Sequence, residues 1–240
     1  MKWKLRLFSV GSFLAIVFAS VTTAAAAPVF TAPVADIDPD DFVSEIDNPY
    51  FPLKPGTTFI YKGESDGTAT RIETTVTGDT RVIMGVTCTV VHDQGFEEGA
   101  LVEDTFDWYA QDEDGNVWYF GEDTRELDED GNVVSTEGSW EAGVDGAKPG
   151  IIMEAHPREG DRYYQELYKG VAEDQAKVLE LDESLCVQYG CFDHVLVTKE
   201  WTRLDPGVVD NKYYARGVGF IYEETVKGGD ETSELVKIRK

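Results

Sequence analysis

The sequence predicts a mainly β protein, in which an antiparallel meander forms a single curled sheet, half-barrel or barrel behind an irregular, proline-rich N-terminal arm. Three observations predict this fold. From Thr57 onward, short runs of β-branched and aromatic residues alternate with Gly, Asp and Asn. A hexapeptide with the character of a hairpin turn occurs twice. Aromatic residues make up 12% of the 240 residues, which is enough to build the core of one such domain.

Residues 1–27 have the layout of a signal peptide. Three basic residues within the first six precede an apolar run over residues 7–19, and small residues follow up to residue 27. The apolar run is shorter than the roughly 20 residues that a permanent membrane helix needs. We therefore expect cleavage after Ala26, a secreted, periplasmic or extracellular mature protein, and no stable membrane span.

Residues 28–56 hold most of the prolines of the chain and are expected to form the irregular arm. Tyr50, Phe51 and Leu53 supply apolar side chains that would dock on the domain that follows.

Residues 57–240 are expected to form a single antiparallel β domain. The expected strands cover residues 57–62, 70–77, 82–92, 101–110, 117–120, 133–139, 162–169, 175–181, 192–202, 211–215, 220–226 and 234–238. Residues 172–183 also contain helix formers, so a helix competes with a strand there.

The hexapeptide Asp-Glu-Asp-Gly-Asn-Val occurs at residues 112–117 and again at 128–133. Its Asp-Gly and Gly-Asn pairs favour the positive φ angles of tight hairpin turns, so the two copies predict three successive antiparallel strands. The repeat also begins like an EF-hand loop, but valine replaces the glycine that such a loop needs at position six. An EF-hand is thus excluded, and a weaker calcium site at Asp112, Asp114 and Asn116 stays an alternative to the plain turn.

The chain has 21 basic and 46 acidic residues and a formal net charge of −25. Removal of residues 1–27 takes away three basic residues and no acidic one, which leaves about −28 by the same counting. Such a field repels nucleic acid and anionic lipid surfaces. Two interpretations stay open, a surface that remains hydrated in salt and a surface that binds divalent cations such as calcium.

Three cysteines in an exported protein suggest one disulfide and one free thiol. A four-residue hairpin loop would set Cys186 opposite Cys191, which leaves Cys88 as a buried strand thiol. Pairing of Cys88 with either of the other two is the alternative.

No nucleophile elbow, Rossmann glycine pattern or P-loop is present in the sequence. His92, His156 and His194 each have an acidic neighbour, which is the chemistry of a zinc or copper site, although their spacing carries no information. The many carboxylates could also include a glycosidase-like pair. A hydrolase that uses carboxylates or a metal is therefore the third hypothesis for function.

Aromatic residues recur at alternate positions of the expected strands, which places their rings on one face of the sheet. If the sheet curls, that face is either a packed core or the wall of a cavity. The leading hypothesis is a non-enzymatic exported β domain that binds an apolar or aromatic small molecule in a cleft lined by Trp108, Trp118, Trp140 and Tyr164. The runner-up is a calcium-dependent surface or structural protein. Protein partners cannot be inferred.

Four stretches carry a resemblance: residues 48–57 (NPYFPLKPGT), 107–123 (DWYAQDEDGNVWYFGED), 140–151 (WEAGVDGAKPGI) and 212–219 (KYYARGVG). Together they resemble a group of exported, β-rich bacterial proteins. The resemblance implies export and a β-rich fold, and it brings no activity with it. More distantly, a run of strands behind a signal peptide is similar to periplasmic half-barrel carriers of lipids and lipoproteins, which is an analogy of fold alone.

Overall fold

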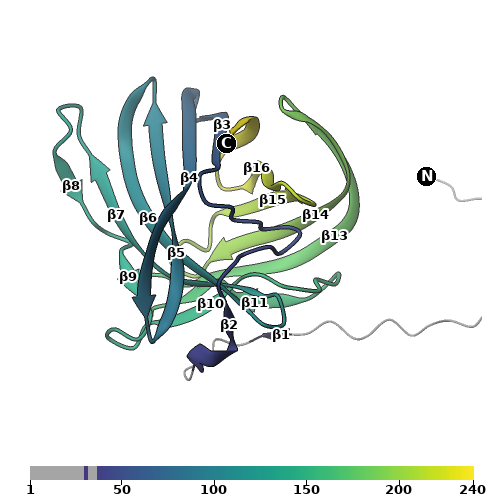
Figure 1. Ribbon diagram of the computed structural model, residues 1–240. Coiled ribbons are helices and arrows are strands. Elements are labelled where there is room, and N and C mark those ends of the chain that lie inside the picture. The colour runs from purple at the N-terminus through teal and green to yellow at the C-terminus, as the bar shows by residue number, and fades with distance from the viewer. Residues whose placement is uncertain (1–29, 32–36) are drawn as a thin grey trace, which may run out of the picture.

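The computed structural model describes residues 30–31 and 37–240 and confirms the expected fold class. Nearly all of its regular structure is antiparallel β, and one continuous sheet is nearly closed into a barrel with one unsealed seam (Figure 1). The expected signal peptide, residues 1–27, lies outside the described residues.

The elements are β1 (Phe30–Thr31), the 3-10 helix η1 (Pro39–Asp41), β2 (Phe42–Val43), β3 (Thr58–Ser65), β4 (Thr68–Ile83), β5 (Val86–Glu97), β6 (Ala100–Asp112), β7 (Val117–Leu127), β8 (Val133–Ser135), β9 (Trp140–Glu141), β10 (Lys148–Met153), β11 (Arg162–Tyr164), β12 (Glu166–Leu167), β13 (Asp174–Val187), β14 (Gly190–Thr202), β15 (Val209–Ala215), β16 (Gly219–Lys227) and β17 (Thr232–Arg239).

Strands β3 to β6 follow one another through two-residue hairpin turns. Asp66–Gly67, Met84–Gly85 and Glu98–Gly99 occupy the central positions of these turns, with φ values between +48° and +92°. Two consecutive positive φ angles define the turn whose twist matches that of the flanking strands. Glycine at each second position adopts this conformation without steric cost, which is why the chain reverses there.

Two contacts bring the ends of the meander together. β17 pairs antiparallel with β3, and β10 pairs antiparallel with β7. β10 lies outside the strands expected from the sequence, because its Lys-Pro-Gly start reads as a turn. Its pairing with β7 contributes to the closure of the barrel.

The alternative of a helix over residues 172–183 is wrong, because β13 covers most of this segment. Ala176 and Val178 are fully buried, and β13 pairs with β14 along most of its length. Cross-strand pairing and burial thus outweigh the weak helix preference of the sequence.

The two copies of the hexapeptide form equivalent turns between β6, β7 and β8, which are successive antiparallel strands as expected. In each turn the first aspartate accepts a hydrogen bond from the backbone N–H of the asparagine four residues later, at 2.8 Å. The glycine N–H donates to the carbonyl oxygen of the same aspartate, at 3.0 Å for Gly115 and 2.9 Å for Gly131. The side chain of the first aspartate therefore closes the turn.

The segment between β2 and β3 crosses the open side of the barrel, between the β3–β7 wall and the β13–β16 wall (Figure 1). An antiparallel bridge joins Ile46 to Leu53 within this segment. Tyr50 and Leu53 are buried in the apolar core, and the ring of Phe51 lies 5.3 Å from that of Tyr109. Residues 50–53 of the arm are thus part of the barrel interior.

Apolar side chains form two clusters. The first, here called the barrel cluster, includes Tyr61, Val91, Leu196, Tyr214 and Ile221. The second, here called the tryptophan cluster, contains Val86, Cys88, Val90, Trp108, Phe120 and Trp140. Val91 and Val90 are neighbours in β5 and belong to different clusters, as the alternation of side chains along a strand requires.

Candidate ligand cavity

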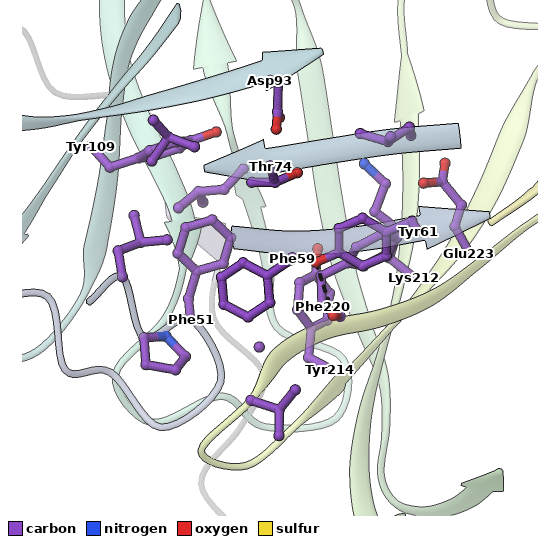
Figure 2. A pocket seen from close by; sticks show the side chains of 17 residues that line it. Phe51, Phe59, Tyr61, Thr74, Asp93, Tyr109, Lys212, Tyr214, Phe220 and Glu223 are labelled. Atoms are coloured by element: carbon purple, nitrogen blue, oxygen red, sulfur yellow. Dashed lines mark hydrogen bonds between the residues drawn. The ribbon is translucent and has the colours of Figure 1, made fainter. Parts of the chain in front are cut away.

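A cavity of about 250 Å³ lies inside the barrel (Figure 2). Its wall combines residues of the arm, of β3 to β6, of β10, and of β15 and β16 with the turn between them. The lining residues are Phe51, Pro52, Leu53, Phe59, Tyr61, Ile72, Thr74, Val91, Asp93, Tyr109, Ile152, Lys212, Tyr214, Val218, Gly219, Phe220 and Glu223. The volume is close to the lower end of ligand pockets, about 300 Å³, so a small organic molecule fits it.

One side of the cavity is apolar and aromatic. Figure 2 shows Phe51, Phe59 and Phe220 gathered there, and the ring of Phe220 lies 5.1 Å from that of Tyr61 and 5.9 Å from that of Tyr214. Phe59 and Phe220 come from strands far apart in sequence, and Phe51 comes from the arm. The arm therefore completes the apolar wall.

A polar anchor holds this part of the arm in place. The backbone N–H of Asn48 donates to the Gln111 side chain at 2.8 Å, and the Asn48 amide donates to the carbonyl oxygen of Gly115 at 2.9 Å. The backbone N–H of Phe51 donates to the carbonyl oxygen of Asn48 at 3.1 Å. Because Asn48 is buried, these bonds fix the turn that presents Phe51 to the cavity.

The other side of the cavity is polar. Asp93 on β5 points toward Thr74 on β4, and Lys212 and Glu223 come from β15 and β16 (Figure 2). Within the described part of the chain, Oδ1 of Asp93 is buried and has no hydrogen-bond partner. Lys212 Nζ lies 3.2 Å from Glu200 Oε2 in an ion pair. Lys212 is thus already ion-paired, whereas Oδ1 of Asp93 can still accept a hydrogen bond.

Buried or partly buried carboxylates surround this polar side, each on a different strand and each in electrostatic interaction with others of the set. We call them the acidic belt: Asp93 (β5), Asp107 (β6), Glu122 (β7), Glu166 (β12), Asp174 (β13), Glu200 (β14) and Glu223 (β16). Lys212 is a basic side chain that many of them share, since its charge acts on Asp93, Glu166 and Glu223. The barrel interior is therefore rich in negative charge.

Burial raises the pKa values of several carboxyl groups of the acidic belt. Desolvation raises the pKa of Asp93 to about 6, and it raises the pKa values of Glu122 and Glu223 to about 7. Burial also raises the pKa of Asp107 well above its usual range, with the charges of Asp93 and Glu122 adding to the effect. Asp93, Glu122 and Glu223 therefore titrate between about pH 6 and pH 7.

The pKa of Lys212 is also raised, but neighbouring charges and not burial are the cause. Burial alone lowers the pKa of a lysine, but the neighbouring Glu200 and Glu223 outweigh burial and raise the pKa of Lys212 well above its usual value. The lysine keeps its charge at neutral pH and is not a nucleophilic amine.

The aromatic residues expected to form a cleft lie elsewhere. Trp108 and Trp140 are buried members of the tryptophan cluster, and Trp118 packs against it. Tyr164 is half-buried on β11, which pairs with β13. The structure thus brings the three tryptophans together and leaves Tyr164 apart from them. The cavity described above is lined by other residues.

In the turn at Asp112, the aspartate side chain accepts hydrogen bonds from nearby residues of the same hairpin. Asp112 Oδ2 accepts hydrogen bonds from the Asn116 amide at 2.9 Å and from Trp118 Nε1 at 2.8 Å. Asp114 is exposed beside it. Among the described residues, no group of three or more His, Cys, Asp or Glu side chains is arranged to hold a metal ion.

The cysteines and histidines lie outside the cavity. A disulfide joins Cys186 to Cys191 at the tip of the β13–β14 hairpin, and Cys88 is a buried free thiol. His92 stacks on Phe106 with ring centroids 4.3 Å apart, and its Nε2 lies 2.7 Å from Asp104 Oδ1. His194 pairs with Asp182, and His156 is exposed.

Sequence reasoning missed the cavity and found neither Asp93 nor Lys212. A signal for them exists in the strands themselves, because Asp107, Tyr109 and Gln111 alternate with Trp108 and Ala110 in β6. A strand with apolar residues on one face and an acid, an aromatic and an amide on the other has two different environments.

Comparisons with known proteins give the fold a limited context. The chain is similar to a solved structure from Bacteroides fragilis that is described as exported and as having a YmcC-like fold, with a TM-score of 0.46 and 16% identity over 80% of this chain and 99% of that one. It is also similar to a Parabacteroides distasonis protein described as a lipoprotein, with a TM-score of 0.45 and 12% identity over the same shares. The sequence matches no protein-family model and no curated protein. Within the described residues, no helix has the length and apolar character to cross a membrane.

Proposed function

We propose that this protein is an exported binding protein that holds a small molecule with an apolar or aromatic body inside the barrel. The observation that carries the proposal is the cavity of about 250 Å³ with an aromatic wall on one side and Asp93 on the other. Pockets that bind small molecules combine a mostly apolar lining with a few placed polar groups, and this cavity has that composition. Export rests on the signal-peptide layout of residues 1–27.

The construction of the wall supports a binding role. Phe51, Pro52 and Leu53 belong to the segment that crosses the open side of the barrel, so movement of this segment would uncover the cavity. Gln111 and Gly115, at the end of β6 and in the turn that follows, anchor the segment through Asn48. Ligand entry would require these hydrogen bonds, the bond from the Gly217 N–H to the Pro49 carbonyl oxygen and the packing of Tyr50 and Leu53 to open, while the strands stay paired.

The test measures binding of an uncharged apolar fluorescent dye, for example N-phenyl-1-naphthylamine, to the mature protein and to Phe51→Ala and Phe220→Ala. Both phenylalanines line the cavity and are only partly buried, so their truncation should weaken dye binding by about tenfold or more with a modest loss of stability. Val226→Ala is the matched control, since Val226 lies on β16 with Phe220 but is 49% exposed.

Native mass spectrometry of protein purified from its own host complements this test, because a copurifying small molecule would identify the natural ligand. The proposal is wrong if the unaltered protein takes up no dye, or if Val226→Ala weakens dye binding as much as Phe220→Ala does.

A further inference from the structure

We propose that the ligand of this cavity is an organic cation, a small apolar or aromatic molecule whose protonated amine pairs with Asp93. This inference rests on the proposed function, since it names the chemical class of the molecule held in the same cavity.

The first argument is the state of Asp93. Its Oδ1 is buried without a hydrogen-bond partner among the described residues, and its side chain points into the cavity (Figure 2). Buried polar atoms are nearly always hydrogen-bonded, so an exception needs an explanation. A donor brought by a ligand would satisfy this oxygen.

The second argument is charge. Glu103 and Asp107 stand close enough to Asp93 to interact with it electrostatically and disfavour its negative charge, as burial does, whereas Thr74, His92 and Lys212 favour that charge. A neutral donor would satisfy one acceptor site and leave the repulsion among the carboxylates unchanged. A cation would reduce that repulsion as well, and in a buried site this electrostatic gain is larger than in water.

The third argument excludes an anionic ligand. Lys212 is the basic side chain in the cavity wall, and it already pairs with Glu200 at 3.2 Å and interacts with Glu223. A ligand carboxylate would have to compete with Glu200 for this lysine. It would also lie inside the acidic belt, where its own negative charge would be repelled.

The fourth argument limits the ligand's size and body. The cavity of about 250 Å³ is lined largely by phenylalanine, tyrosine and aliphatic residues, and among the described residues no group of three or more His, Cys, Asp or Glu side chains is arranged to hold a metal ion, which disfavours a metal ion as the ligand. Tyr61 and Tyr109 stand with Asp93 in the cavity wall, and the faces of aromatic rings attract ammonium groups. A primary amine joined to an aromatic ring by a short alkyl chain meets both conditions.

The test uses three ligands with the same phenylpropyl body: phenylpropylamine, phenylpropanol and phenylbutanoate. Their affinities for the unaltered protein are measured by isothermal titration calorimetry at about pH 8, where Asp93, whose pKa is about 6, is ionised. We expect the amine to bind at least about tenfold more tightly than the alcohol, and the carboxylate to bind most weakly. This series does not depend on the folding of any variant.

Asp93→Asn assigns the effect to one residue. The variant should lower the affinity for the amine to about that for the alcohol and should leave the alcohol unchanged. Asp130→Asn is the control for the general negative field of the surface, since Asp130 lies exposed in a hairpin turn, and it should change neither affinity. The field of exposed charges is also screened over about 8 Å at physiological ionic strength, so the preference for the amine should persist in salt.

The outcomes separate the two proposals. If the alcohol binds as tightly as the amine, the cation inference is wrong and the binding function stands. If Asp93→Asn keeps the preference for the amine, Asp93 is not its partner and the inference is wrong. If none of the three ligands binds and no dye is taken up, the binding function itself is wrong.

Discussion

The two faces of β5 and β6 bury different chemistry. On one face Cys88, Val90 and Trp108 pack into the apolar tryptophan cluster. On the other face Asp93 and Tyr109 line the cavity. Residues only one position apart in sequence thus have opposite roles, because neighbouring side chains of a strand point to opposite sides. The apolar face stabilises the fold, whereas burial of the carboxylates on the other face costs stability, which a ligand of the proposed kind would offset.

Trp108→Ala should have the largest effect on stability. Trp108 is 4% exposed and packs in the tryptophan cluster, and the guanidinium of Arg81 lies 4.1 Å from the centroid of its ring. Truncation of a buried tryptophan costs about 3 to 5 kcal/mol. Urea unfolding followed by circular dichroism measures the loss, and dye binding by the folded fraction should stay unchanged.

The opposite result for Trp108 would be informative. A Trp108→Ala variant that keeps its stability and loses the dye would mean that the ligand binds on the tryptophan side. That outcome would favour a ligand site at the tryptophans, as expected from the sequence, and would reverse the roles assigned to the two faces.

Acidification should raise the free energy of unfolding through the buried carboxyl groups of the acidic belt. The pKa of Glu122 in the folded protein is raised from 4.5 to about 7, mainly by burial, so the folded state holds its proton more tightly than the unfolded state does. Such a group contributes stability that is fully present below about pH 4.5 and is lost as the pH rises through about 7. Glu122 alone should contribute roughly 2 to 3 kcal/mol at pH 5 relative to pH 8, at about 1.4 kcal/mol per pKa unit.

Matched variants separate this effect from surface repulsion, which acid also relieves. Glu122→Gln should reduce the gain in unfolding free energy between pH 8 and pH 5, because a neutral amide replaces the carboxyl that titrates. Glu129→Gln removes one acid from an exposed hairpin turn and should leave the pH dependence almost unchanged. Equal pH dependence of both variants and the unaltered protein would show that the belt does not titrate as described.

The fold could be predicted from the sequence to a large extent, and the candidate site only slightly. The alternating pattern and the repeated turn residues report local preferences, so most strands between residues 57 and 240 were expected near their observed places. The cavity depends on which of the two faces of a strand turns inward, and on the arm that lies across it. Asp93 and Lys212 are 119 residues apart in the numbering and meet only because the sheet closes.

The tryptophans also show why the candidate site could not be predicted from the sequence pattern alone. Trp108 alternates with Phe106 in β6 and Trp118 alternates with Phe120 in β7, and all four rings belong to the tryptophan cluster or pack against it. A ring in a packed cluster and a ring in a cavity wall give the same pattern in the sequence. A buried carboxylate is more informative than an aromatic ring here, because its burial needs a compensating partner.

The disulfide should stabilise the fold without any effect on either face. Cys186 and Cys191 are five positions apart at a hairpin tip, and closing so short a loop in the unfolded chain corresponds to about 2 kcal/mol in the chain-entropy view. The double variant Cys186→Ser/Cys191→Ser should lose about this much in urea unfolding and bind the dye normally. A change in dye affinity would show that the tip of the β13–β14 hairpin is coupled to the cavity.

Calcium should have the smallest effect, and its test distinguishes exposed acids from those of the belt. Sodium chloride screens exposed carboxylates and should raise the melting temperature of so acidic a protein, whereas buried charges are screened much less. We expect calcium chloride at equal ionic strength to add little, because Asp112 already accepts hydrogen bonds from Asn116 and Trp118 that a calcium ion would have to displace. A clear additional rise in calcium would instead indicate specific binding through ligand linkage. If the ion binds at the turn, Asp112→Asn should abolish that additional rise and Asp93→Asn should preserve it. If the ion enters the belt, Asp93→Asn should remove the rise and Asp112→Asn should preserve it.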